Sequence, residues 1–193
     1  LADAAAAPLY FVLGNHDHYG ASIGTVRDAV VELASRRPEI QWLPPLGPVR
    51  LDRETLLVGI DGWADGRHGD PLRTPLVLND DRLIQEVAAQ GGRAARVMVK
   101  RILADADAKR LDTILGRAAS ESPRRIVVAT HVPPFPEAIP AGSREAHPDW
   151  QPLLISGATG KVLGEFAATH PGIEILVLAG HTHRGHQVRI GDN

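Results

Sequence analysis

The sequence predicts an α/β fold with its chemistry at the ends of strands. Apolar runs of the kind that form interior strands alternate with stretches whose apolar residues fall at helical spacing. Three of these runs lead directly into metal-ligand side chains: residues 9–13 into Gly14-Asn15-His16-Asp17, residues 126–130 into His131, and residues 173–179 into Gly180-His181-Thr182-His183. Because α/β proteins bind ligands at the carboxyl ends of such strands, we expect these imidazoles to meet at one place.

The first half of the chain continues this alternation. Residues 25–37 carry apolar side chains at helical spacing, and Pro38 closes the predicted helix. Residues 55–60 form the next apolar strand. Residues 61–75 are rich in Gly, Asp, Arg and Pro, which predicts a loop near the site, with Trp63 as an anchor to the core.

The second half of the chain is predominantly helical and then irregular. Apolar residues fall at helical spacing in three stretches: residues 79–90, 93–119 and 161–170. Within the second of these stretches, breaks are possible near Asp105 and Gly116. Six prolines in residues 133–152 predict an irregular surface loop, and residues 188–190 look like a strand that leads into a turn.

Composition excludes several classes of protein. With 193 residues, 44% of them hydrophobic, the chain predicts a single domain, residues 1–193, with a substantial core. A formal charge of -2 favours neither nucleic acid nor an anionic membrane as a partner. No apolar run approaches the ~20 residues of a membrane helix, so we expect a soluble protein and favour the cytoplasm; the oligomeric state stays open. The absence of cysteine leaves only nitrogen and oxygen ligands for a metal.

In this order, and at these strand ends, the three motifs resemble the calcineurin-like metallophosphoesterase superfamily. The match extends from Leu9 to His183. The resemblance implies a four-layer α/β/β/α sandwich and hydrolysis of a small phosphomonoester or phosphodiester substrate. It also implies a dinuclear centre of two divalent ions with a metal-bound hydroxide as nucleophile. Manganese, iron and zinc are all compatible with the ligands.

The resemblance assigns a role to each motif residue. Asn15, His131 and His181 would bind one metal ion, and His183 would bind the other. His16 would act on the substrate phosphate or the leaving-group oxygen, as general acid or charge stabiliser. Asp17 would hold the His16 ring by a hydrogen bond.

One part of the family pattern has no counterpart here. That pattern begins with an Asp-x-His strand and a Gly-Asp segment, which supply two ligands of the first metal and the carboxylate that bridges both. Neither precedes Gly14, so we expect a domain truncated at its N-terminus, and at its C-terminus as well, that cannot assemble the full dinuclear site alone. The alternatives are a catalytically inactive interaction module of the same fold and a metal-dependent nuclease.

Other polar residues receive plainer interpretations. Four histidines are interpreted as exposed loop residues: His18, His68, His147 and His186. Asp61 is interpreted as the turn-forming residue of an Asp-Gly pair. The basic stretch over residues 93–101 is interpreted as a solvated helix face, which leaves the nuclease without the basic groove that it would need.

Overall fold

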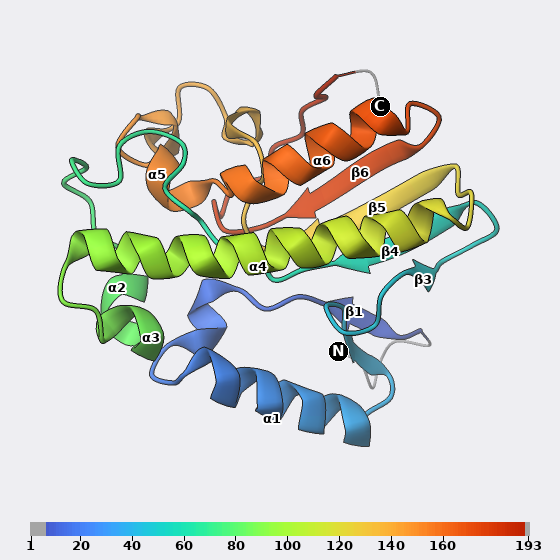
Figure 1. The fold of residues 1–193 in the computed structure, drawn as a ribbon, viewed down its shortest axis with the longest axis horizontal. Coiled ribbons are helices and arrows are strands. Elements are labelled where there is room, and N and C mark those ends of the chain that lie inside the picture. The colour runs from blue at the N-terminus through green and yellow to red at the C-terminus, as the bar shows by residue number, and fades with distance from the viewer. Residues whose placement is uncertain (1–6, 192–193) are drawn as a thin grey trace.

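The computed structural model describes residues 7–191, which form a mixed α/β fold with two sheets and six α-helices (Figure 1). In the smaller sheet, β1 (Leu9–Phe11) pairs in parallel with β2 (Ile40–Trp42). The larger sheet has the order β3-β4-β5-β6, with these strands: β3 (Val49–Arg50), β4 (Thr55–Gly59), β5 (Arg125–Thr130) and β6 (Glu174–Ala179). β3 runs antiparallel to β4, and the other neighbours are parallel. The predicted α/β class is therefore confirmed.

The three longest helices lie at predicted positions but do not have all the predicted ends, whereas the short helix at residues 151–154 begins within the stretch predicted to be an irregular loop. The α-helices are α1 (Ile23–Arg36), α2 (Asp80–Leu83), α3 (Gln85–Ala88), α4 (Arg93–Ala119), α5 (Gln151–Leu154) and α6 (Gly157–Thr169). Three 3₁₀-helices accompany them: η2 (Asn15–His18), η3 (Pro136–Ala138) and η4 (Arg144–Ala146). α1 begins before the predicted residue because the Ser22 side chain caps it, accepting from the Thr25 N–H at 3.0 Å.

Two helical features are resolved differently from the sequence pattern. α4 continues without a break through Asp105 and Gly116, since it is packed along its length by core residues such as Leu111, which outweighs the cost of ~1 kcal/mol for one glycine. The helix predicted over residues 79–90 is instead two single turns, α2 and α3, because Ile84 between them has extended backbone angles. α2 and α3 are packed against η2 and α4, so tertiary contacts and not helical propensity hold them.

The main core lies between the larger sheet and two helices. Alternate residues of β4 and β5 point to this side: Leu56, Val58, Ile126 and Val128. They are packed against Leu111 and Leu115 of α4 and Phe166 of α6. On the other side of the sheet, Leu57 and Val127 contact Leu43 and residues of β1, so the smaller sheet covers this region.

β6 lies at the edge of the larger sheet, within the part of the chain that the structure describes. The apolar run over residues 173–179 predicts an interior strand, and this prediction is wrong. Ile175 and Val177 face the main core, but Leu176 and Leu178 are 42% and 53% exposed. An apolar run shows that a strand exists, but which of its faces are covered depends on elements elsewhere in the chain.

The remaining predictions concern loops, short strands and charge. The strand predicted over residues 188–190 is not formed. Conversely, β2 and β3 are present but were not predicted, because strands of two or three residues show too little alternation of apolar and polar residues. Lys100 in the basic stretch is 9% exposed and pairs with Asp81, so the interpretation of a solvated face is wrong for this residue. The Ala-rich start, residues 1–6, and the terminal turn at 192–193 lie outside the described residues. None of the helices within 7–191 has both the length and the apolar character needed to cross a membrane.

Candidate metal centre

The three ligand motifs meet at the carboxyl ends of β1, β5 and β6. β1 leads through residues 12–14 into η2, which carries Asn15. β5 and β6 pair in register up to Thr130 and Ala179, and the Gly180 N–H then donates to the His131 carbonyl at 2.9 Å. This register places the residues that follow the two strands side by side. The expectation that the imidazoles meet at one place is confirmed.

Asn15, His131 and His181 form a compact set that we call the inner set. His131 Nε2 lies 2.9 Å from Asn15 Oδ1 and 3.2 Å from His181 Nδ1. The two imidazole rings cross nearly edge to face, with centroids 5.0 Å apart. Asn15 is buried, and both histidines are half-buried. The set therefore presents one amide oxygen and two ring nitrogens at a single point.

Neighbouring groups keep the inner histidines neutral and oriented. Burial, together with the charge of His181, lowers the pKa of His131 from 6.5 to about 4. Burial also lowers the pKa of His181. His181 Nε2 lies 3.0 Å from the Leu153 carbonyl, which can only accept, so Nε2 carries the proton and Nδ1 keeps its lone pair. A neutral imidazole with a free lone pair, as at His181 Nδ1, is the form that binds a metal ion.

A glycine makes room for the His131 ring. A Cβ atom placed on Gly14 would lie 2.6 Å from His131 Cε1, closer than atoms tolerate. Gly14 has an ordinary φ of -102°, so it is required here for space and not for backbone freedom. Gly180 on the other side is less constrained, because its added Cβ would lie 3.5 Å from His131 Nδ1.

The segment after β6 has an unusual backbone. His181 and His183 have positive φ angles of 66° and 56°, and the only other non-glycine residue with positive φ within the described residues is Ser122. Left-handed backbone at a bulky residue costs energy and is concentrated at functional sites. The two bends direct the rings to different neighbours: His181 to His131, and His183 to His16.

His16 and His183 form what we call the outer pair. Their rings meet edge to face with centroids 5.8 Å apart, and both residues are exposed. The His16 ring also lies against Tyr19, with centroids 4.8 Å apart. The outer pair thus borders the inner set on its solvent side.

The hydrogen bond of Asp17 differs from the expected one. Asp17 Oδ2 accepts from the Gly14 backbone N–H at 2.7 Å, instead of holding the His16 ring. Asp17 is the third residue of η2, and a carboxylate at that position reaches back to the N–H at the start of the helix. Asp17 therefore shapes the loop that carries Asn15 and His16.

Asp61 connects several segments around the site, a role that its interpretation as the turn-forming residue of an Asp-Gly pair did not predict. Its Oδ1 accepts from the Leu13 N–H at 3.0 Å and from Trp42 Nε1 at 2.9 Å, while its Oδ2 accepts from Arg27 at 2.9 Å. Its backbone carbonyl accepts from the His131 N–H at 2.7 Å. One buried residue at the end of β4 therefore ties together the loops that carry Asn15 and His131. No local pattern around residue 61 indicates these partners.

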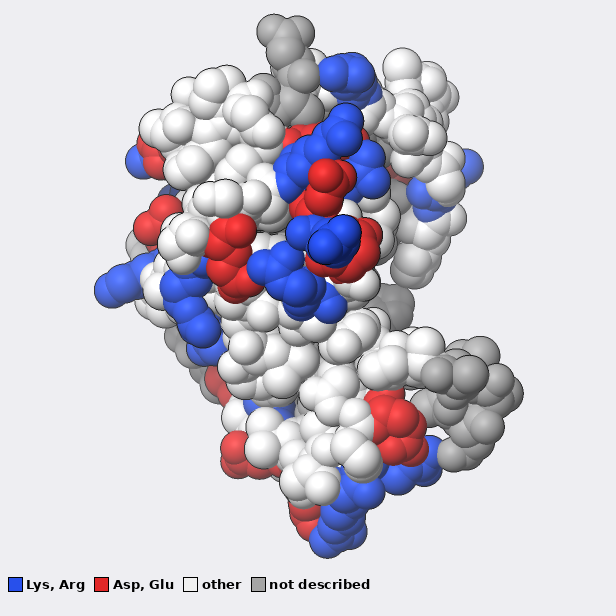
Figure 2. Space-filling model, turned by 90° about the vertical axis from the view of Figure 1, so that its right-hand side faces the viewer, with Lys and Arg blue, Asp and Glu red and all other residues white. Residues whose placement is uncertain are grey.

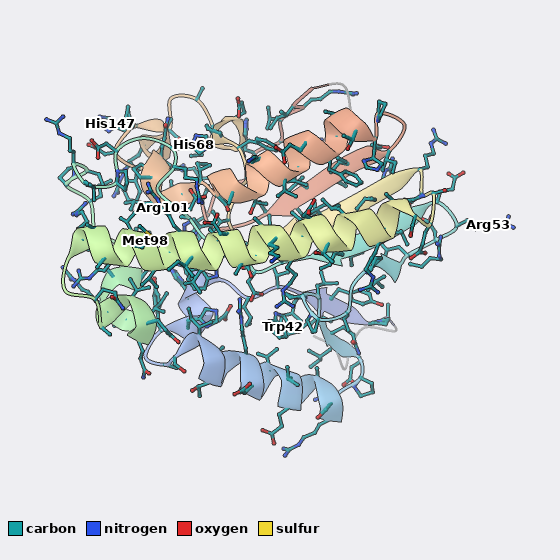
Figure 3. The ribbon with its side chains drawn as sticks, in the orientation of Figure 1. Trp42, Arg53, His68, Met98, Arg101 and His147 are labelled. Carbon is teal, nitrogen blue, oxygen red and sulfur yellow. The ribbon has the colours of Figure 1, made fainter. Side chains whose placement is uncertain are left out.

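The remaining histidines lie apart from this cluster or beneath it. His18, expected to be exposed, is completely buried against Trp63, with ring centroids 5.4 Å apart. Trp63 is buried, as predicted for a loop anchor. His147 and His186 are exposed, as predicted, whereas His68 is half-buried. Figure 3 shows His68 and His147 in the loops at the left end of the molecule.

A small cavity separates the inner set from α4. It has a volume of about 10 Å³ and is lined by Asn15, Trp63, Asp80, Lys100 and His181, among others. This volume suits about one water molecule. The cavity is therefore too small to admit an organic substrate between the inner set and α4.

The donor set of the inner residues suits a divalent transition metal. Ligands bound to one ion at 2.0–2.1 Å lie roughly 3 Å apart, which agrees with the spacings of 2.9 and 3.2 Å around His131 Nε2. Across residues 7–191, however, no three His, Cys, Asp or Glu side chains are grouped to hold an ion. The described residues therefore supply two imidazoles and an amide, which is part of a coordination sphere.

Comparison with known proteins identifies a family for the chain. A family model described as calcineurin-like phosphoesterase matches residues 1–185, which is nearly the whole chain. Searches among curated proteins and among solved structures found no match.

Proposed function

The chain belongs to the calcineurin-like phosphoesterase family, whose members are generally hydrolases, and on this premise we propose that it hydrolyses a phosphomonoester or phosphodiester with divalent metal ions. The observation that carries the proposal is the convergence of an amide oxygen and two neutral imidazoles 2.9–3.2 Å apart at neighbouring strand ends. The partial cover of the larger sheet by the smaller one, with helices outside, supports the four-layer α/β/β/α arrangement for the domain.

In this proposal the inner set holds one ion, and His183 belongs to a second. Manganese, iron and zinc all suit nitrogen and oxygen ligands. When bound, such ions withdraw charge from phosphoryl oxygens and lower the pKa of a coordinated water. The left-handed backbone at His181 and His183 supports the division, because it turns two rings that are two residues apart to different sides.

His16 is the residue proposed to act on the substrate. Its ring is exposed beside His183, on the side from which a phosphoester can approach. A protonated imidazole there would stabilise the phosphoryl oxygens or donate a proton to the departing alkoxide. The hydrogen bond from Gly14 to Asp17 holds the turn that presents this ring.

Two other functions are weaker candidates. An inactive module of the same fold is favoured by one observation: the described residues provide no carboxylate to complete the inner set. A nuclease finds less support, since Lys and Arg are interleaved with Asp and Glu on the face shown in Figure 2. Closer to the site, Arg27 is paired with Asp61 and Lys100 with Asp81, which reduces the charge available to bind phosphates.

The proposal is tested by manganese-dependent hydrolysis of an aryl phosphate and an aryl phosphodiester by the full-length protein. We expect His16→Ala to lower turnover by about 10²–10⁴-fold, the range for a lost proton donor. His181→Ala should also lower it, and His147→Ala, in an exposed loop, is the matched control. Unchanged turnover in both site variants would contradict the mechanism. A protein that binds manganese but hydrolyses neither substrate would support the inactive module.

A further inference from the structure

The amide of Asn15 is enclosed by two side chains that no sequence motif indicates. Asn15 Nδ2 donates to Asp80 Oδ1 at 2.6 Å and to the Tyr19 hydroxyl at 3.3 Å. The Tyr19 hydroxyl in turn donates to the same Asp80 oxygen at 2.7 Å. The three groups form a closed triangle in which Asp80 accepts twice.

This triangle determines which end of the amide faces the inner set. An amide nitrogen only donates, and an ionised carboxylate only accepts, so Nδ2 must point to Asp80. Both Nδ2 hydrogens are then engaged, and Oδ1 is directed at His131 Nε2, 2.9 Å away. A flipped amide would place its nitrogen, which cannot bind a metal, among the ligands and would leave Asp80 facing an oxygen.

Burial makes this orientation costly to lose. Asn15 and Asp80 are each only 6% exposed, so water cannot readily replace either partner. Burial and the hydrogen bond to Asp80 raise the pKa of Tyr19, and the phenol therefore keeps its proton and stays a donor. The triangle is thus satisfied in one arrangement of donors and acceptors.

The backbone holds Asp80 at this place independently of Asn15. Two backbone hydrogen bonds join the residues around α2 and α3 to the segment after η2. The Gly20 N–H donates to the Leu83 carbonyl at 2.8 Å, and the Gln85 N–H donates to the Ala21 carbonyl at 3.2 Å. The adjacent Asp81 has a different partner and pairs with Lys100 of α4. Asp80 is therefore presented to Asn15 by a fixed support.

We propose that Asp80 is a positioning residue for metal binding, which holds the Asn15 amide with its oxygen toward His131 and His181. This inference rests on the proposed function, in which Asn15 is a ligand. It explains why a single-turn helix 65 residues away in the sequence is fastened to the ligand loop. Asp80 also adds a negative charge near the site, which favours a bound cation.

The experiment is a calorimetric titration of the full-length protein with Mn²⁺. We expect Asp80→Ala to weaken the affinity by about 10–100-fold, the usual effect of removing a group that orients a ligand. Asp80→Asn can present its own amide oxygen to Asn15 and should recover most of the affinity. Asp81→Asn changes the neighbouring carboxylate without touching Asn15, and it should bind as the wild type does.

The double variant separates positioning from general support. If Asp80 acts through Asn15, Asn15→Ala combined with Asp80→Ala should bind no more weakly than Asn15→Ala alone. If the double variant loses Mn²⁺ affinity by the product of the two single-variant losses, the inference is overturned. It is also overturned if Asn15→Ala weakens Mn²⁺ binding and Asp80→Ala does not. Unchanged binding by Asn15→Ala would instead contradict the ligand set of the proposed function.

A second readout covers the case in which Asp80→Ala does not fold. Asp80→Asn and Tyr19→Phe are milder changes, and each is loaded with Co²⁺ after its fold is checked by circular dichroism. Because Tyr19→Phe removes one partner of the amide, it should shift the visible absorption of bound Co²⁺, whereas Asp81→Asn should not. A Co²⁺ spectrum of Tyr19→Phe identical to the wild type, with unchanged Mn²⁺ affinity, would contradict the inference.

Discussion

The inner set and the outer pair are adjacent but built differently. In the inner set, Asn15 is held by Asp80, and His181 is held by the Leu153 carbonyl. In the outer pair, His16 and His183 are exposed and meet their neighbours through ring contacts. Oriented, desolvated ligands bind an ion with little reorganisation, and an open pair can admit a substrate. Folding therefore fixes the orientation of the inner set and leaves the outer pair exposed, which in the proposed function keeps the substrate side accessible.

Among these changes, we expect the largest effect from the loss of Asp61, which connects the loops that carry the inner set. Asp61→Ala leaves buried donors of Leu13 and Trp42 without their acceptor and breaks the pair with Arg27. We expect a loss of about 3–5 kcal/mol in the free energy of unfolding, measured by urea denaturation. Asp112→Ala on the exposed face of α4 is the control. A loss below about 1 kcal/mol, within the range of a surface substitution, would show that Asp61 does not support the site.

Substitutions in the inner set and in the outer pair should have different effects on Mn²⁺ affinity. His131→Ala deletes the nitrogen that both other inner atoms face, so Mn²⁺ affinity should fall by at least ~100-fold, more than for a supporting residue. His183→Ala should leave this ion bound with a smaller loss. Isothermal titration of the two variants measures the contrast, and equal losses would abolish the distinction between inner set and outer pair.

Two glycines give a matched steric test. Gly14→Ala places a methyl group 2.6 Å from the His131 ring, which must move, and we expect about 10–100-fold weaker Mn²⁺ binding. Gly180→Ala places its methyl group at 3.5 Å, an ordinary contact, and should change binding much less. If Gly14→Ala binds as tightly as Gly180→Ala, the position of the His131 ring is not important for the ion.

The smallest expected effect is on the pH dependence of stability without metal. The pKa of His131 is about 4 in the folded state and 6.5 when unfolded, so the unfolded state binds more protons between these values. The contribution of neutral His131 is present above pH 6.5 and is lost as the pH falls toward 4. His131→Gln should therefore lose less stability on acidification, as followed by thermal unfolding from pH 7 to pH 4.

Other buried groups also titrate below pH 6.5. Burial lowers the pKa of His18 and of His181, so both contribute in the same direction as His131. Burial and the nearby charge of Asp61 raise the pKa of Asp107 to about 6, so this carboxyl contributes the opposite slope. Its effect is common to the wild type and His131→Gln and cancels in their difference. Parallel stability curves for the two proteins would contradict the lowered pKa of His131.

The residues that meet at the site were predictable from sequence because their signals are local. An apolar run followed by Asn15 and His16, or by His181 and His183, indicates a strand end that carries ligands. The expectation that these ends meet required only the rule for carboxyl ends of parallel strands. The roles of these residues in metal binding and catalysis stay predictions.

The supports of the site were not predictable, because they join residues far apart in the chain. Asp80 reaches Asn15 across 65 residues, and Asp61 reaches Leu13 across 48. By pattern alone, one resembles a helix start and the other a turn. The burial of His18 and the exposure of Leu178 likewise depend on which elements cover them.

The sequence by itself determined the α/β class, the family resemblance and the residues that line the site, since strand runs and motifs are written in consecutive residues. Only the tertiary structure decided which atom of Asn15 faces His131, which carbonyl orients His181 and that Asp61 connects the two ligand loops through its carboxylate and its backbone carbonyl. The reason is physical: orientation follows from hydrogen bonds and burial, and both depend on partners that folding brings together from distant segments.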